Sequence, residues 1–198
     1  MDFRWKLKDV LMVAVCAALF GVVYLGCVYA GSVLRGLLMP FGLGPLAYEP
    51  FYGIFFMAGA FGVYVMRKPG TGVIAELLAA VIECLLGNFF GPIVILSGLV
   101  QGAGFELVIA LKRYRKFDAL TMTEAAVVCS LITLVYNIFI SGYSMIAVPV
   151  LCLMLAVRLA SAILFDVFVT MRMADGLARA GVLKGYAVAE GLTEEPEE

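Results

Sequence analysis

The sequence contains no histidine, and only one of its 198 residues is tryptophan. Without imidazole the commonest general base is missing, and neither a histidine-activated nucleophile nor a catalytic or structural zinc site is expected. The five cysteines are odd in number, widely spaced and set in apolar stretches, which indicates free thiols rather than disulfides. There is also no Gly-x-x-x-x-Gly-Lys-Ser/Thr phosphate loop. We therefore expect no enzyme, no resident cofactor or metal, and no nucleic-acid partner.

Charge is scarce as well. Charged residues make up 15% of the chain, against about 25% in an ordinary globular domain, and 64% of the residues are hydrophobic. A soluble domain of this size buries only about 70% of the surface that its unfolded chain exposes, so the excess apolar surface would face water. The composition therefore predicts an integral membrane protein.

Six apolar runs approach the length of about 20 residues that a helix needs to cross a hydrocarbon core of about 30 Å. Charge clusters and Gly/Pro-containing segments separate them, and we expect segments 42–50, 88–92 and 142–149 to be turns at a membrane surface. The predicted spans are residues 9–30, 50–66, 71–88, 92–111, 123–143 and 149–173. The expected fold class is all-α: a polytopic membrane protein built as a six-helix transmembrane bundle.

The basic residues predict the orientation of this bundle. Twelve of the 14 lysines and arginines precede the first span, join the second to the third or the fourth to the fifth, or follow the sixth. Arg35 lies in an opposite loop and Arg158 within a span. Because lysine and arginine accumulate in cytoplasmic loops, both termini are predicted to be cytoplasmic. The alternative that the first span is a cleaved signal peptide conflicts with its long apolar stretch and with this charge pattern.

One membrane domain over residues 1–180 is expected, followed by a cytoplasmic tail at 181–198 that ends in an acidic, proline-containing run and is predicted to be disordered. Small residues four apart predict close helix contacts within the bundle or with another membrane subunit. The pairs are Ala14 and Ala18, Ala17 and Gly21, Ala58 and Gly62, and Gly98 and Gly102.

Several ionisable side chains fall within or at the ends of the spans, where each costs about 2.5–3.5 kcal/mol on insertion scales and usually faces the bundle interior. The carboxylates are Glu49, Glu76, Glu83, Glu106 and Asp166. Arg158 is either part of a functional site or only the counter-ion of Glu83 or Glu49. For Glu106 we favour pairing with a basic residue, Lys112, Arg113 or Arg172, at the cytoplasmic surface.

Aromatic, amide and carboxylate side chains gather in the predicted outer leaflet, at the ends of the second, third and fifth spans. Such a mixture suits a flat, polar heterocycle that can carry a positive charge. An alternative for the tyrosines, Tyr143 included, is the aromatic belt found at membrane interfaces.

A set of segments spread over the first 180 residues carries a family resemblance. They read Tyr48-Glu49-Pro50-Phe51-Tyr52-Gly53, Phe56-Met57-Ala58-Gly59, Arg67-Lys68-Pro69-Gly70, Ala75-Glu76-Leu77-Leu78-Ala79-Ala80, Leu86-Gly87-Asn88, Gly98-Leu99-Val100-Gln101-Gly102 and Glu106-Leu107. Together they resemble the YkoE group of substrate-binding S-components of energy-coupling factor (ECF) transporters, which are associated with thiamin and its hydroxymethylpyrimidine precursor.

The resemblance implies a multi-pass protein of the prokaryotic plasma membrane that captures its vitamin in the outer half of the bilayer. It would have no energy source of its own and would dock on a transmembrane coupling subunit driven by two ATPase subunits. An Ala-x-x-x-Ala pattern in the first helix resembles the docking surface of S-components, and Ala14 and Ala18 match it. Relatives can carry tryptophan where this chain has Phe89 and Phe90, so ring stacking would fall to phenylalanine or tyrosine.

The resemblance and the side-chain chemistry agree on one candidate site. A thiazolium cation can be held by aromatic faces and a carboxylate, and an aminopyrimidine edge can pair with Glu, Asn and Gln. The predicted polar contacts are Glu49, Glu83, Asn88, Gln101, Tyr136 and Asn137, and the stacking candidates are Tyr48, Tyr52 and Phe90.

Three other functions stay open. One is an S-component for another vitamin or precursor. Another is a proton-coupled small-molecule carrier, or a small membrane enzyme, that uses Glu76, Glu106 and Asp166 as a relay. The third is a purely structural subunit that binds no ligand.

Overall fold

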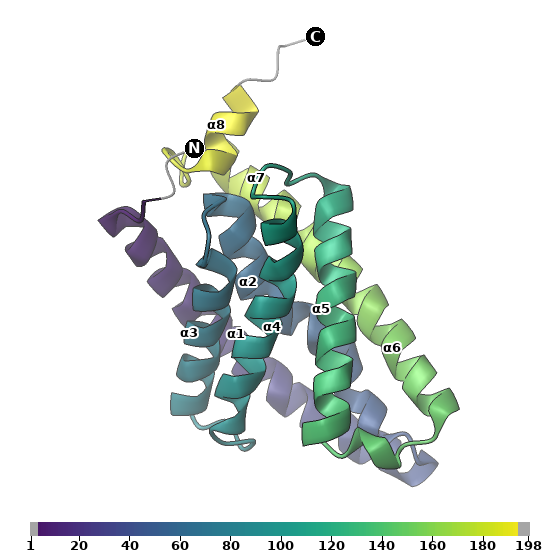
Figure 1. Cartoon of the computed structure of the whole chain (residues 1–198). Coiled ribbons are helices and arrows are strands. Elements are labelled where there is room, and N and C mark those ends of the chain that lie inside the picture. The colour runs from purple at the N-terminus through teal and green to yellow at the C-terminus, as the bar shows by residue number, and fades with distance from the viewer. Residues whose placement is uncertain (1–3, 194–198) are drawn as a thin grey trace.

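The computed structural model describes residues 4–193, a part of the chain that is helical and contains no strand (Figure 1). The α-helices are α1 (Leu7–Leu38), α2 (Tyr52–Met66), α3 (Thr71–Leu85), α4 (Ile93–Leu111), α5 (Ala119–Ile140), α6 (Val148–Ala162), α7 (Thr170–Arg179) and α8 (Ala187–Thr193). Three short 3₁₀ helices, η1 (Met39–Phe41), η2 (Gly44–Phe51) and η3 (Tyr143–Met145), lie between them, and a π-helical segment, η4 (Ile163–Val169), joins α6 to α7.

Five stretches of the described chain are long and apolar enough to cross a membrane: Leu7–Phe41, Gly44–Met66, Ile93–Leu111, Ala119–Ile140 and Val148–Arg179. The 15-residue α3, which carries Glu76 and Glu83, packs between α1 and α4 as the remaining helix of the bundle. The predicted all-α, six-helix membrane bundle is therefore confirmed, with α3 shorter than a typical span.

The ends of several helices differ from the prediction. The first helix continues to Leu38 rather than stopping near residue 30, and the last span runs on through η4 to Arg179. Segment 42–50, predicted to be a turn, is mostly the 3₁₀ helix η2. Pro45 lies in the first turn of η2, where a backbone N–H would have no partner within the helix, so this proline begins a helix rather than breaking one.

The join between η2 and α2 is secured by Ser161 of α6. Its hydroxyl donates to the carbonyl of Pro50 at 2.6 Å and accepts from the backbone N–H of Gly53 at 3.1 Å. A Cβ atom at Gly53 would lie 2.2 Å from the carbonyl oxygen of Ser161, so only glycine permits this approach. The start of α2 is thereby fixed against α6.

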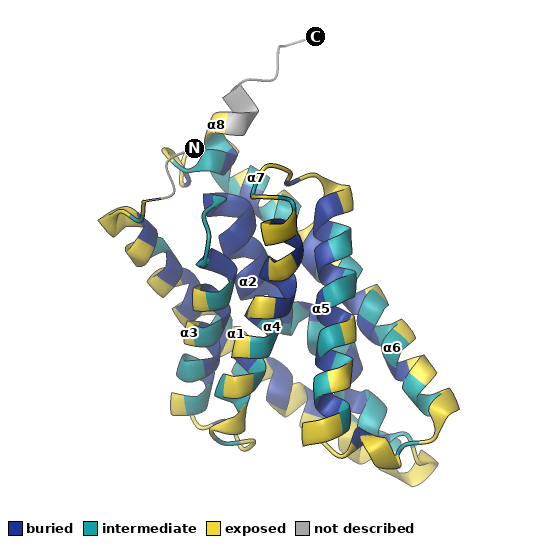
Figure 2. Ribbon diagram, viewed as in Figure 1, coloured by how far each residue is buried: buried dark blue, intermediate teal, exposed yellow. Residues whose placement is uncertain are grey.

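Helix α2 forms the centre of the bundle, with 12 of its 15 residues buried (Figure 2). Glycines bring its neighbours close. A Cβ at Gly102 would lie 2.8 Å from Cα of Val73, and one at Gly98 would lie 2.5 Å from Cβ of Ala80, so α4 packs directly on α3. The predicted small-residue contact of the fourth span thus lies inside the bundle.

The remaining small-residue pairs divide between the interior and the surface. Ala58 and Ala17 are fully buried, and Gly21 and Gly62 lie against α3. Ala14 and Ala18, by contrast, lie on an exposed face of α1. A docking surface at this pair stays a prediction, and the structure leaves the face open to a partner helix.

Ordered structure extends beyond residue 180. Leu183 and Val188 are buried, and the hydroxyl of Tyr186 donates to the carbonyl of Lys8 at 2.8 Å. The segment predicted to be a disordered tail therefore begins with turns that contact the start of α1, followed by α8, which packs on α2 and α7. Residues 194–198, with the acidic run, lie outside the described residues.

The glycine contact between α2 and α6 gives a stability prediction. Replacing Gly53 with alanine should lower the free energy of unfolding by about 1–3 kcal/mol, because the added methyl group meets backbone and neither helix can yield. Gly26→Ala in α1, where the added Cβ meets nothing within 4 Å, is the matched control and should leave stability equal or slightly higher. Thermal unfolding in detergent measures both, and equal midpoints for the two variants would contradict the packing described.

Candidate functional site

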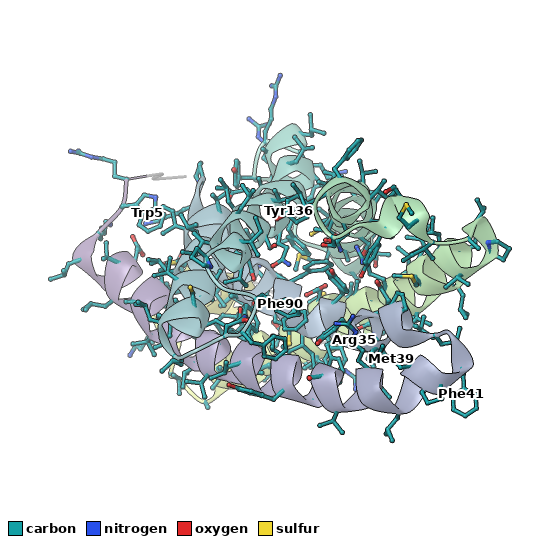
Figure 3. The ribbon with its side chains drawn as sticks, turned by 90° about the horizontal axis from the view of Figure 1, so that it is seen from below. Trp5, Arg35, Met39, Phe41, Phe90 and Tyr136 are labelled. Carbon is teal, nitrogen blue, oxygen red and sulfur yellow. The ribbon has the colours of Figure 1, made fainter. Side chains whose placement is uncertain are left out.

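A cavity of about 310 Å³ lies at the end of the bundle opposite the chain termini, which is the predicted outer side. Residues of α1, η2, α2, α3, α4 and η3 form its walls. Figure 3 looks at this end, where Arg35, Phe90 and Tyr136 lie around the opening while Phe41 points away from the bundle. The volume falls at the lower end of the range for small-molecule sites, about 300–1,000 Å³.

The three side chains predicted to stack on a ligand all lie on the cavity wall, among other aromatic residues. Tyr48 meets Phe90 edge to face with ring centroids 5.4 Å apart, and Tyr52 lies beside them on the cavity wall. Gly31 of α1 makes room for Tyr48, because a Cβ there would lie 2.5 Å from the tyrosine ring. The site therefore offers several π-faces set at angles to one another, which suits a flat ring.

Glu83 supplies the carboxylate of the cavity wall. It is 2% exposed and accepts a hydrogen bond from the side-chain amide of Asn88. The amide oxygen of Asn88 accepts in turn from the backbone N–H of Phe90 at 2.7 Å. Asn88 is not itself part of the wall; it fixes both the carboxylate and the phenylalanine that are.

Gln101 of α4 also lines the cavity directly. Tyr136 of α5 stands behind it, with its hydroxyl 3.1 Å from the hydroxyl oxygen of Ser97, which is on the wall. Asn137, 4% exposed, donates its side-chain amide to the hydroxyl of Tyr52. Tyr136 and Asn137 thus act on the cavity through Ser97 and Tyr52.

Glu49 lies next to the cavity but is bound to Arg158. The guanidinium Nε is 2.6 Å from Oε2 and Nη2 is 2.8 Å from Oε1, a bidentate ion pair in which both residues are fully buried. Nη1 donates to Thr133 at 3.1 Å, and the guanidinium carbon lies 3.6 Å from the ring centroid of Tyr52. Of the two counter-ions left open for Arg158, the structure has Glu49. Glu49 is not one of the residues that line the cavity.

Tyr143 connects this ion pair to the cavity. It lines the wall, and its hydroxyl donates to Glu49 Oε1 at 3.2 Å. Burial raises the pKa of the Tyr143 phenol well above its usual value, so the hydroxyl stays a hydrogen-bond donor across the physiological range. A membrane-belt role alone does not account for this contact.

The cavity also contains wall residues that the sequence did not single out as binding candidates, among them Tyr24, Arg35 and Ser97. Arg35 was assigned to a loop because the first span was predicted to end eight residues too early. It lies in the last turn of α1. The sequence did contain a signal for its role, because Arg35 is the one basic residue that the predicted orientation places in a loop on the outer side.

Among the described residues, the inner carboxylate Glu106 forms no salt bridge with a basic side chain, so the predicted pairing is wrong. It accepts from the hydroxyl of Tyr114 at 2.6 Å, from the backbone N–H of Val73 at 2.9 Å and from that of Gly70. Lys112 pairs with Glu124 instead. The first N–H groups of α3 have no partner within their helix, so the start of that helix is itself a good site for a carboxylate.

The buried ion pair gives a second prediction. Arg158→Met should lower the free energy of unfolding by about 3–5 kcal/mol, because it leaves the Glu49 carboxylate buried without a counter-charge. The double variant Arg158→Met with Glu49→Met should recover much of this loss, because no lone charge remains. Chemical unfolding of the two single variants and the double variant measures the coupling. Losses that simply add would show that the pair makes no joint contribution.

Comparisons with known proteins agree with one another on the class of protein. The family described as "ABC-type cobalt transport system, permease component" matches residues 8–133. A Bacillus subtilis (strain 168) protein named as an HMP/thiamine permease, YkoE, is 38% identical over 188 residues, which is 95% of this chain and 92% of that protein. A crystal structure titled as an S-component of an ECF transporter superposes with a TM-score of 0.91 and 38% identity, covering 96% of this chain and 94% of the other.

The cobalt in the first description has no counterpart among the residues that the structure describes, where no group of three or more His, Cys, Asp and Glu side chains could hold a metal ion. The other two matches cover nearly the whole chain and the complete bundle around the cavity. The relatives are transport proteins rather than enzymes. The chain is therefore a multi-pass membrane protein that belongs to the permease-component family matched over residues 8–133 and to the YkoE family of ECF transporter S-components.

Proposed function

We propose that this chain captures thiamin or its hydroxymethylpyrimidine precursor as the S-component of an ECF importer in a prokaryotic plasma membrane. The observation that carries the proposal is the cavity, in which Glu83 and several aromatic faces lie together at the predicted outer end of the bundle. The name of the Bacillus subtilis relative, an HMP/thiamine permease, supports the same ligand class.

The geometry suggests how such a ligand is held. A pyrimidine ring fits against Tyr48, Tyr52 and Phe90, and the Glu83 carboxylate faces its amino group or the positive charge of a thiazolium. Gln101 offers both a donor and an acceptor to the ring edge. Asn88, Asn137 and Tyr136 act as positioning residues, and Glu49 contributes through its ion pair with Arg158 and its bond to Tyr143.

The partners follow from the class of protein. In the proposed assembly, a transmembrane coupling subunit packs on the exposed face of α1 at Ala14 and Ala18, and two ATPase subunits drive it from the cytoplasm. Both alanines are exposed on a face where small side chains allow another helix to approach closely.

A proton-coupled carrier with a relay of Glu76, Glu106 and Asp166 receives less support. Glu106 is held by the hydroxyl of Tyr114 and by two N–H groups at the start of α3, as a structural carboxylate would be. The cavity, moreover, lies at the other end of the bundle from that site.

Ligand binding tests the site. Glu83→Gln should weaken thiamin binding at least tenfold, because it removes the charge that faces the ligand. Asn137→Ala should weaken binding by a smaller factor, because Tyr52 loses the group that fixes its hydroxyl. Titration calorimetry is the suitable measurement, since the one tryptophan, Trp5, is hydrogen-bonded to Pro69 far from the cavity.

The control is Glu124→Gln, which removes a carboxylate from a salt bridge with Lys112 that lies outside the cavity. Its affinity should equal that of the wild type. Thiamin and hydroxymethylpyrimidine are titrated separately, so the preferred ligand emerges from the same series. Wild-type affinity in both cavity variants, or no binding of either compound, would contradict the proposed function.

A large side chain introduced at the proposed docking face tests the coupling to the ATPases. Ala18→Trp should leave thiamin binding unchanged and reduce thiamin uptake at least tenfold in cells that carry the coupling and ATPase subunits. Val135→Trp, on an exposed position of α5, is the matched control and should preserve uptake. Equal uptake by the two variants would remove this face of α1 from the docking proposal.

A further inference from the structure

Two carboxylates in the middle of the bundle have no positive partner within residues 4–193, the part of the chain that the structure describes. Asp166, in the π-helical segment η4, is fully buried, and Glu76 of α3 is 1% exposed. Both oxygens of Asp166 and Oε1 of Glu76 accept no hydrogen bond from any residue that the structure describes. If both groups were ionised, two interacting negative charges and three acceptor oxygens without a described donor would be buried inside the bundle, which is a costly arrangement.

The surroundings of the pair supply no cation. Glu76 is the charged group that acts electrostatically on Asp166, and Glu83, one level further out on α3, acts on Glu76. The other titratable neighbours are Tyr24 from α1 and Cys129 from α5. Arg158 of α6 is already committed to Glu49 and Thr133. Against Glu76, α2 and α4 bring the glycines Gly59 and Gly102, which carry no charged side chain.

We propose that Glu76 and Asp166 together form a proton-binding site that holds one proton in the folded protein at neutral pH. The proton removes one of two like charges and converts one carboxylate from a pure acceptor into a donor. A π-helical segment inside a membrane span is rare and occurs frequently at functional sites, and here it places Asp166 in the interior.

The hydrogen bonds assign the proton to Asp166. Oε2 of Glu76 accepts from the backbone N–H of Gly59 at 2.7 Å and from the hydroxyl of Tyr24 at 3.2 Å, and two donors stabilise its ionised form. Asp166 has no such donor among the described residues. The neutral acid is therefore the form of Asp166 that fits its environment.

Tyr24 joins the proton site to the ligand cavity. Its ring lines the cavity, and its hydroxyl both donates to Glu76 and accepts from the backbone N–H of Ala58 at 2.9 Å. A ligand in the cavity is thus one side chain away from the proton.

Infrared spectroscopy of the ligand-free protein tests the proposal. The wild type should show the carbonyl stretch of a protonated carboxylic acid at neutral pH, shifted in D₂O, and the Asp166→Asn difference spectrum should contain this band. Asp175→Asn on α7, where the carboxylate accepts from Tyr64 at 3.1 Å, is the matched control and should retain the band. Two results would overturn the proposal: a wild-type spectrum that lacks the band, or a band that is unchanged in the spectra of both the Asp166→Asn and the Glu76→Gln variants.

Stability provides a second readout. Asparagine resembles protonated aspartic acid, so Asp166→Asn should fold with an unfolding midpoint at least equal to that of the wild type at pH 7. Because a proton bound only in the folded state is lost as pH rises, the wild-type midpoint should fall from pH 6 to pH 9, and that of Asp166→Asn should fall less. Failure of Asp166→Asn to fold while Asp175→Asn folds would count against the site. Both measurements omit ligand, so their outcome is independent of the proposed function.

Discussion

The bidentate ion pair between Arg158 and Glu49 holds together the outer half of this molecule. It joins η2 to α6 and, through Thr133 and Tyr143, to α5 and η3, so that η2 is held against three consecutive elements that begin about 70 residues later in the chain. The same guanidinium lies 3.6 Å from the ring centroid of Tyr52. In a dry interior neither charge has an alternative partner, so the outer ends of these helices are constrained to meet. The cavity lies between the outer ends of these helices and those of α1, α3 and α4.

The cavity is built in two layers of polar side chains. Glu83, Gln101 and Tyr52 face the space, whereas Asn88 and Asn137 stand behind the wall and fix a carboxylate and a phenol. An amide suits the second layer because it donates and accepts without adding charge. Such support holds the wall side chains in one orientation, which would reduce the entropy lost if the proposed ligand binds there.

The fold class and the six-helix bundle could be predicted from the sequence, because apolar length and charge position are local signals, and three of the aromatic residues on the cavity wall were also predicted. Pairing across the bundle could not. Arg158 and Glu49 are 109 positions apart, and the sequence left Glu49 and Glu83 equally open as the counter-ion. The role of Arg35 depended on where α1 ends, and no proline or charge cluster marks residue 30 as its end. The partners of Glu106 were predicted wrongly because they include backbone N–H groups, which every residue except proline carries and no sequence pattern singles out.

The unequal lengths of α1 and α3 have a consequence for the surrounding lipid. At 1.5 Å per residue α1 is about 48 Å long and α3 about 22 Å, and the two helices pack against each other. A hydrocarbon layer of about 30 Å matches neither, so α1 must tilt while acyl chains beside α3 must shorten or disorder. The protein therefore carries a permanent local distortion of its bilayer, concentrated on the flank where these helices meet. The tilt of α1 would differ between membranes of different thickness. The angle between the membrane plane and the face that carries the exposed alanines of α1 would differ with it.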